Sequence, residues 1–190
     1  MRPVEDRRVA RTRTALIDAF NHLVLARRQK RIRVSDIVAL ANVGRSTFYE
    51  HYASADDLHM QALSRPMAAL ADAAAGEGDA DRLRNLLAHF WENRQRARET
   101  FGDRAYAKVC RLLADMVATR LEARQAPLIL PTRLAAVQLA EASLAPLRAW
   151  LAGEAPCTSE ALAAAICRTA EHMIAALSEH PVAGAVDARR

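Results

Sequence analysis

Apolar residues recur along most of the chain at intervals of three and four, the spacing of one face of an α-helix. Leu83, Leu87 and Phe90 show this spacing, as do Leu144 and Leu147 further along. No stretch alternates apolar and polar residues in the way that a half-buried strand would. The pattern therefore predicts an all-α protein of about nine helices.

Past residue 55, the spacing predicts one long helix from about Asp56 to Ala75, ended by the GEGD stretch at residues 76–79. A proline within a helix removes a backbone hydrogen bond and bends the axis, and Pro66 and Pro146 both fall inside predicted helices. Thr158 is a suitable N-cap for the last helix. Further apolar repeats predict helices around residues 83–90, 106–117, 137–151 and 162–177.

Residues 33–52, RVSDIVALANVGRSTFYEHY, predict two short helices joined by a tight turn. Ser35 is placed to cap the first helix, and Asp36 puts negative charge at the positive end of its dipole. Asn42 tolerates the left-handed backbone that a tight stop requires. Gly44 is an acceptable N-cap for the second helix.

In that second helix, Phe48 and Tyr52 are four residues apart and are expected to point inward together. The opposite face carries donors for phosphate oxygens and one arginine, the side chain best suited to guanine O6 and N7. Such a polar outer face is typical of a helix that reads DNA. Its residues are Arg45, Ser46, Thr47, Tyr49 and His51.

Over about the first sixty residues, the chain closely resembles the N-terminal module of the tetracycline-repressor (TetR) family of transcriptional regulators. The resemblance rests on RTRTALIDAFNHLVLARR, VSDIVALANVGRSTFYEHY and SADDLHMQAL, and TFYEHY is its most specific part. It implies that the recognition helix begins at Arg45 and that Tyr49 and His51 hold the DNA backbone. Family members commonly carry Lys where this chain has Ala55, and Arg33 or the N-terminal arginines are candidates to replace that contact. The expected DNA-binding residues are Arg33, Ser35, Gly44, Arg45, Ser46, Thr47, Tyr49 and His51.

Charge is distributed in agreement with this interpretation. Residues 1–52 hold 11 Lys and Arg against 5 Asp and Glu, whereas the whole chain has a formal net charge of +5. The positive excess thus lies on the segment expected to meet a polyanion. A solvated basic face is the alternative explanation.

The resemblance implies two domains, a DNA-binding domain at residues 1–55 and a ligand-binding and dimerisation domain at 56–190. It also implies a homodimer in which the last two long helices of each copy meet. A twofold dimer reads two half-sites of a palindromic operator in double-stranded DNA, about 34 Å or more apart. Packing against their own domain is the other explanation for these apolar helices. The expected interface residues are Val137, Leu144, Leu147, Leu151, Leu162, Ile166, Met173 and Leu177.

A regulator of this kind is expected to release its operator when a small hydrophobic effector enters the second domain. Aromatic side chains make up only 5% of the residues, and the large ones of this domain are candidates to line the cavity. Filling the core is the competing role for each of them. The expected lining comprises His89, Phe90, Trp91, Phe101, Tyr106, Met116, Glu141 and Trp150.

Other functional classes find little support. The nearest match to a helical di-iron motif is Asp56 with His59, without a second copy, and no nucleophile or phosphate-loop motif occurs. Three cysteines without CxxC spacing suggest neither a disulfide framework nor a zinc site, so no metal or cofactor is expected. No apolar run approaches the ~20 residues of a membrane span, and a cytoplasmic protein is expected. A helical ligand-binding or interaction protein without specific DNA binding is the alternative function.

Overall fold

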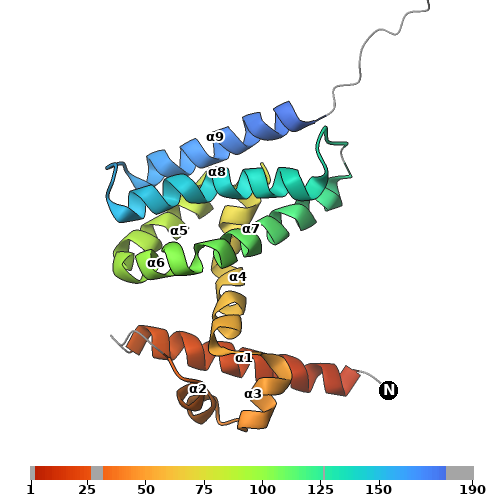
Figure 1. The fold of residues 1–190 in the computed structure, drawn as a ribbon, viewed down its shortest axis with the longest axis vertical. Coiled ribbons are helices and arrows are strands. Elements are labelled where there is room, and N and C mark those ends of the chain that lie inside the picture. Colours follow the sequence, from red (N-terminus) through yellow and green to blue (C-terminus); the bar gives the residue numbers. More distant parts are fainter. Residues whose placement is uncertain (1–2, 27–31, 126, 179–190) are drawn as a thin grey trace, which may run out of the picture. The chain divides into compact units, whose positions relative to one another are not determined.

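A computed structural model describes residues 3–26, 32–125 and 127–178 of the chain. Within these ranges the chain forms nine α-helices and no strand, with one isolated backbone bridge between Leu128 and Ser178 (Figure 1). The predicted all-α class is thereby confirmed. None of the described helices is long and apolar enough to cross a membrane. The helices are α1 (Pro3–Ala26), α2 (Val34–Ala41), α3 (Arg45–His51), α4 (Ala55–Ala74), α5 (Ala80–Glu92), α6 (Arg94–Thr100), α7 (Asp103–Arg124), α8 (Thr132–Ala152) and α9 (Ser159–Leu177).

The chain divides into two compact units, Met1–Pro66 and Met67–Arg190. The division falls inside α4, directly after Pro66, whereas the sequence placed the domain boundary at residue 55, where α4 begins. The first three turns of α4 thus belong to the N-terminal unit. They contribute Leu58 to the core of that unit.

Four helices build the N-terminal unit around one small core. α1 contributes Leu16 and Phe20, and α2 and α3 contribute Ile37 and Phe48, all of them buried. Burying a side chain of this size stabilises a fold by about 1.5–3 kcal/mol. The core therefore fixes the orientation of the short helices α2 and α3.

The turn between α2 and α3 forms as the sequence predicted, apart from one cap. Asn42 ends α2 in the left-handed conformation, with φ 54° and ψ 46°, and Gly44 is the N-cap of α3. The predicted cap at Ser35 is wrong, because α2 begins at Val34 and its N-cap is Arg33, without a side-chain hydrogen bond. Ser35 is instead exposed on the first turn.

The C-terminal unit is arranged around the second half of α4. Met67, Leu70 and Ala74 are fully buried there, so this part of α4 is enclosed by its neighbours. α8 lies along both α7 and α9, and α5 packs against α9 (Figure 1). Thr158 caps α9 as predicted, because its hydroxyl accepts a hydrogen bond from the backbone N–H of Ala161.

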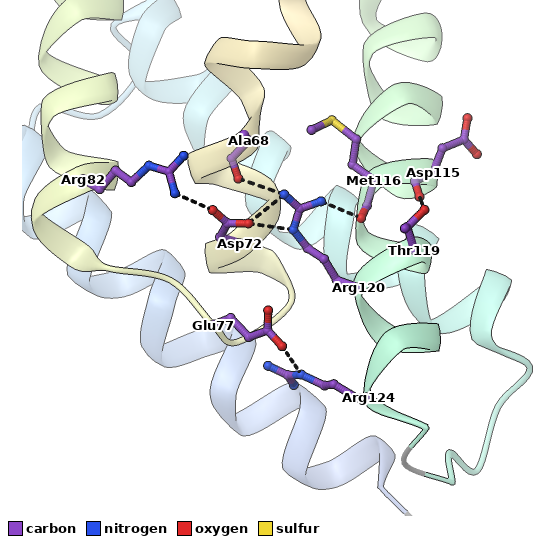
Figure 2. Close-up of polar contacts among 9 residues, drawn as sticks. All are labelled: Ala68, Asp72, Glu77, Arg82, Asp115, Met116, Thr119, Arg120 and Arg124. Atoms are coloured by element: carbon purple, nitrogen blue, oxygen red, sulfur yellow. Dashed lines mark hydrogen bonds and ion pairs between the residues drawn. The ribbon is translucent and has the colours of Figure 1, made fainter. Parts of the chain in front are cut away.

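One carboxylate joins this buried part of α4 to two neighbouring helices (Figure 2). Asp72 lies 2.6 Å from Arg120 of α7 and 2.8 Å from Arg82 of α5. Arg120 also donates to the carbonyl oxygens of Met116, at 2.8 Å, and Ala68, at 3.5 Å. Asp72 and its two arginine partners, here called the Asp72 cluster, therefore tie α4, α5 and α7 together.

Six of the eight residues expected at a dimer interface are buried within their own unit, so their side chains are not exposed on the surface of the single chain. They lie where α8 and α9 pack on other helices of the same chain. Apolar spacing identifies the buried face of a helix, but it does not tell whether the same chain or a second copy covers that face. Val137 is 37% exposed and Met173 is partly exposed. The six buried residues are Leu144, Leu147, Leu151, Leu162, Ile166 and Leu177.

The short helix α6 was not predicted, since RQRARET contains no apolar repeat and buries only Ala97. Arg94, its first residue, donates from Nε to the carbonyl oxygen of Leu151 at 2.7 Å. That carbonyl lies near the end of α8, where cations are favoured by the helix dipole. α6 is thus positioned by its polar contacts.

Candidate nucleic-acid interface

The helix α3 is held by two aromatic side chains on its inner side. Phe48 is fully buried and Tyr52, directly after the helix, is 4% exposed, with their ring centroids 5.8 Å apart. Burial raises the pKa of Tyr52, an effect that the positive charge of Arg13 opposes. The predicted inward face is confirmed, and it fixes which side of α3 faces outward.

The outer side of α3 presents the predicted polar groups. Arg45, Ser46 and Tyr49 are exposed, whereas Thr47 and His51 are half-buried at the edges of this face. The guanidinium of Arg45 lies 5.8 Å from the centre of the Tyr49 ring, close enough for a cation–π contact. Donors for phosphate oxygens and base edges thus project together from one short helix.

Glu50 also lies on this face, and the sequence interpretation missed it. Successive helical residues are turned by about 100°, so a residue two positions from Phe48 leaves the helix on nearly the opposite side. Ser46 and Glu50 both satisfy this condition, and both are exposed. The helical spacing around Phe48 was the signal that could have identified Glu50 from the sequence.

The remaining expected DNA-binding residues also lie at the surface. Arg33 is exposed at the start of α2, and Gly44 is exposed in the turn before α3. The backbone of Gly44 has φ −68°, and a Cβ there would meet only side-chain oxygens of Ser46 and Thr47 at 3.6 Å. The fold itself thus does not require glycine at this position.

Basic residues outside α3 extend the charged surface. Arg7, Arg8, Arg11 and Arg13 of α1 are all exposed. A second basic cluster, at residues 27–31, lies outside the described residues. Ala55, where the family commonly has lysine, is followed in the first turn of α4 by Asp57, which accepts from the backbone N–H of Ala53 at 3.0 Å.

His59, on the second turn of α4, is expected to make the N-terminal unit sensitive to acid. Its ring lies 5.3 Å from that of Phe20, and burial lowers its pKa below the usual 6.5, opposed by Asp56. The unfolded chain therefore binds more protons near pH 6.5 than the folded chain does, and folding stability falls as the pH drops through that value. We expect the melting temperature of the N-terminal unit to fall between ~pH 7.5 and ~pH 5, and to fall less in a His59→Leu variant. Equal decreases in both proteins would contradict this assignment.

The eight residues expected to line an effector cavity do not gather around one space in the described part of the chain. Phe90 and Phe101 pack edge to face in the core, with ring centroids 5.2 Å apart. Trp91 and Trp150 stack at 4.6 Å, and the indole N–H of Trp150 donates to the carbonyl oxygen of Cys157. Phe90, Phe101 and Trp150 are buried, as their competing core role predicts, whereas Trp91 is 41% exposed.

The rest of that expected set is also divided. His89 lies 3.4 Å from Asn93, within the same stretch of chain, and Met116 provides the carbonyl oxygen bound by Arg120. A hollow of about 500 Å³ is lined by Arg94, Gln95, Arg98 and Glu99, none of which was predicted. The aromatic lining therefore has no support from these contacts.

Tyr106 and Glu141 do meet, between α7 and α8. The Tyr106 hydroxyl donates to Glu141 Oε2 at 2.5 Å, and the Cys110 thiol donates to Glu141 Oε1 at 3.1 Å. Burial, together with the hydrogen bond to Glu141, raises the pKa of Cys110 to about 12 and raises that of Tyr106. All three cysteines are free, and Cys110 is held as a neutral thiol.

Comparisons with known proteins find similarity to transcriptional regulators. A TetR transcriptional regulator from Streptococcus agalactiae is 27% identical, with a TM-score of 0.47, and the match covers 88% of this chain and 98% of that one. The dihydroxyacetone kinase operon activator DhaS is 20% identical, with a TM-score of 0.49, over 88% of this chain and 98% of its own. YxbF of Bacillus subtilis (strain 168), an uncharacterized HTH-type transcriptional regulator, is 45% identical over 69 residues.

The chain is thus similar to a solved structure described as a TetR transcriptional regulator. The curated match is to a transcriptional regulator of the helix-turn-helix type, the class of protein that the sequence predicted. The match to YxbF covers 35% of this chain and 18% of that protein, so the chain spans less than a fifth of its length. No protein-family model matches the chain.

Proposed function

We propose that this TetR-like chain is a DNA-binding transcriptional regulator that inserts α3 into the major groove of its operator. The exposure of Arg45, Ser46 and Tyr49 at the surface of α3, while Phe48 of the same helix is buried, carries the proposal. A helix buried on both sides could not reach the base edges of DNA. α3 has one exposed side, and that side carries hydrogen-bond donors. The surrounding arginines of α1 supply charge for phosphate contacts.

The proposed regulator acts as a homodimer on a palindromic operator. A single α3 of seven residues reaches few base pairs, and a twofold pair doubles the sequence that is read. The side of α8 away from the core offers exposed Leu134 and Val137, and α9 offers exposed Ala161 and Ala165. Small side chains let helices approach closely, so these outward residues replace the six buried ones in the proposed interface.

We further propose that the protein is a repressor released by a small effector bound in the C-terminal unit. The support is the family resemblance together with a helix, α4, that runs from one compact unit into the other. A thermal-shift screen against small compounds would identify stabilising ligands. Those ligands are expected to displace the protein from DNA, and a ligand that tightened DNA binding would contradict release.

Selection of bound sequences from a random duplex pool tests the core of the proposal. A palindromic consensus would support specific binding and twofold symmetry together, with half-sites about 34 Å or more apart. Enrichment of no consensus would favour a helical interaction protein without specific DNA binding. Enrichment of a single unrepeated site would contradict the homodimer.

Arg45 is the proposed base reader, and its removal should therefore affect both affinity and preference. Arg45→Ala is expected to cost ~1–3 kcal/mol of operator binding and to relax the preference at one position. Tyr49→Phe and His51→Ala, at proposed backbone contacts, should weaken all sequences more evenly. Titrations against operator and random duplexes measure both quantities. Unchanged affinity and preference in Arg45→Ala would remove Arg45 from this role.

A further inference from the structure

Glu50 is the one acidic side chain of α3. It is exposed, and within the described part of the chain it makes no hydrogen bond and no ion pair. It lies four residues from Ser46, on the same strip of the helix and nearly opposite Phe48. The strip centred on Ser46 and Glu50 is thus the outermost part of α3.

A carboxylate in this position meets a restrictive chemical environment if α3 enters a groove. The walls of the groove are phosphates, which repel a negative charge, and a carboxylate has no proton to donate to them. On the floor of the major groove, guanine presents two acceptors and thymine presents one acceptor beside a methyl group. Adenine presents an amino donor beside its N7 acceptor, whereas cytosine presents the N4 amino donor alone.

We propose that Glu50 selects cytosine, by accepting a hydrogen bond from its N4 amino group, and rejects DNA that lacks cytosine at that position. This inference rests on the proposed function, because it requires α3 to lie in the major groove. Arg45 gains affinity on most sequences through its positive charge. Glu50 has the opposite effect, since its charge weakens binding wherever the matching amino group is missing. It therefore contributes to specificity through repulsion as well as attraction.

The proposal predicts opposite changes for matched and unmatched DNA. Glu50→Gln removes the charge and supplies an amide, which pairs well with adenine N6 and N7. Affinity for the wild-type operator should fall roughly tenfold, affinity for random duplex should rise, and the preferred base should move from cytosine toward adenine. A merely solvated carboxylate would produce neither the fall nor the change of base.

Asp18 of α1 provides a matched control. It is an exposed carboxylate in the same unit, and it too makes no hydrogen bond or ion pair within the described residues. Asp18→Asn removes the same charge, so any general electrostatic gain should appear in both variants. Only Glu50→Gln should alter the ratio of operator to random affinity. Because both side chains are exposed and neither makes a hydrogen bond or ion pair with the described residues, both variants should keep the wild-type circular dichroism spectrum and melting temperature.

The experiment is sequence selection from a random duplex pool with the full chain, in wild-type, Glu50→Gln and Asp18→Asn forms. Support requires a wild-type palindrome with cytosine at one symmetric position that changes in Glu50→Gln alone. The same consensus and the same affinity ratio in all three proteins would overturn the role of Glu50 and leave the proposed function standing. A wild-type selection without any consensus would overturn the proposed function, and this inference with it.

Discussion

Replacing Phe48 with alanine is expected to unfold the N-terminal unit at moderate temperature and to abolish sequence-specific DNA binding. Phe48 is fully buried among Leu16, Ile37 and Tyr52, and truncating a phenylalanine in such a core costs about 3–5 kcal/mol. Domains are stable by only about 5–15 kcal/mol, and a unit of this size lies toward the lower end. The loss therefore removes most of the stability that orients α3.

Thermal unfolding followed by far-ultraviolet circular dichroism measures this effect. A decrease of more than about 10 °C in the melting temperature of the N-terminal unit is expected for Phe48→Ala. Leu40→Ala is the control, because Leu40 lies in the same unit on α2 but is 47% exposed, and its loss should cost within about 0.5 kcal/mol. Similar melting temperatures for the two variants would show that Phe48 is not the anchor of α3.

Replacing Asp72 with alanine is expected to destabilise the C-terminal unit by about 2–3 kcal/mol. The carboxylate side chain is 23% exposed, so the cost lies between that of a buried pair and that of a surface pair. Its removal leaves Arg120, which is 21% exposed, without its acidic partner between α4 and α7 (Figure 2). Arg82 is 59% exposed, and water can replace its partner at little cost.

Denaturant unfolding of single variants separates these contributions. Arg120→Ala should approach the effect of Asp72→Ala, whereas Arg82→Ala should cost less than about 1 kcal/mol. The surface pair of Arg84 and Asp81 is the control, with side chains 42% and 78% exposed, and Arg84→Ala should change the stability by no more than a few tenths of a kcal/mol. If Asp72→Ala were no worse than Arg84→Ala, the Asp72 cluster would not hold α4 in place.

The elements of the N-terminal unit could be predicted from local chemistry. Asn42 in a left-handed stop, Gly44 as an N-cap and the four-residue spacing of Phe48 and Tyr52 each depend on a few neighbouring residues. Ser35 failed as a cap because the helix begins two residues earlier, with Arg33 as its N-cap, and capping preference does not fix a boundary that closely. Glu50 was missed because a search for positive and hydroxyl groups overlooks an exposed carboxylate on the same helix.

The helices of the C-terminal unit could be predicted from the sequence, but the way they pack together could not. The apolar spacing of Leu144 and Leu147 locates an inward face, yet it cannot tell whether the chain itself or a second copy covers that face. Ion pairs between distant positions, such as Asp72 with Arg120, leave no periodic signal. The aromatic residues were grouped by size, whereas Phe90 and Trp91 face different partners although they are adjacent in sequence.

Trp91 and Trp150, which stack on each other, allow tryptophan fluorescence to distinguish the two units. These are the two tryptophans of the chain, and both belong to the unit formed by residues 67–190. Indole fluorescence therefore reports on the C-terminal unit alone, whereas circular dichroism records helix loss in both. An equilibrium melt in which helix is lost before the fluorescence changes would show that the C-terminal unit stays folded after the N-terminal unit has unfolded.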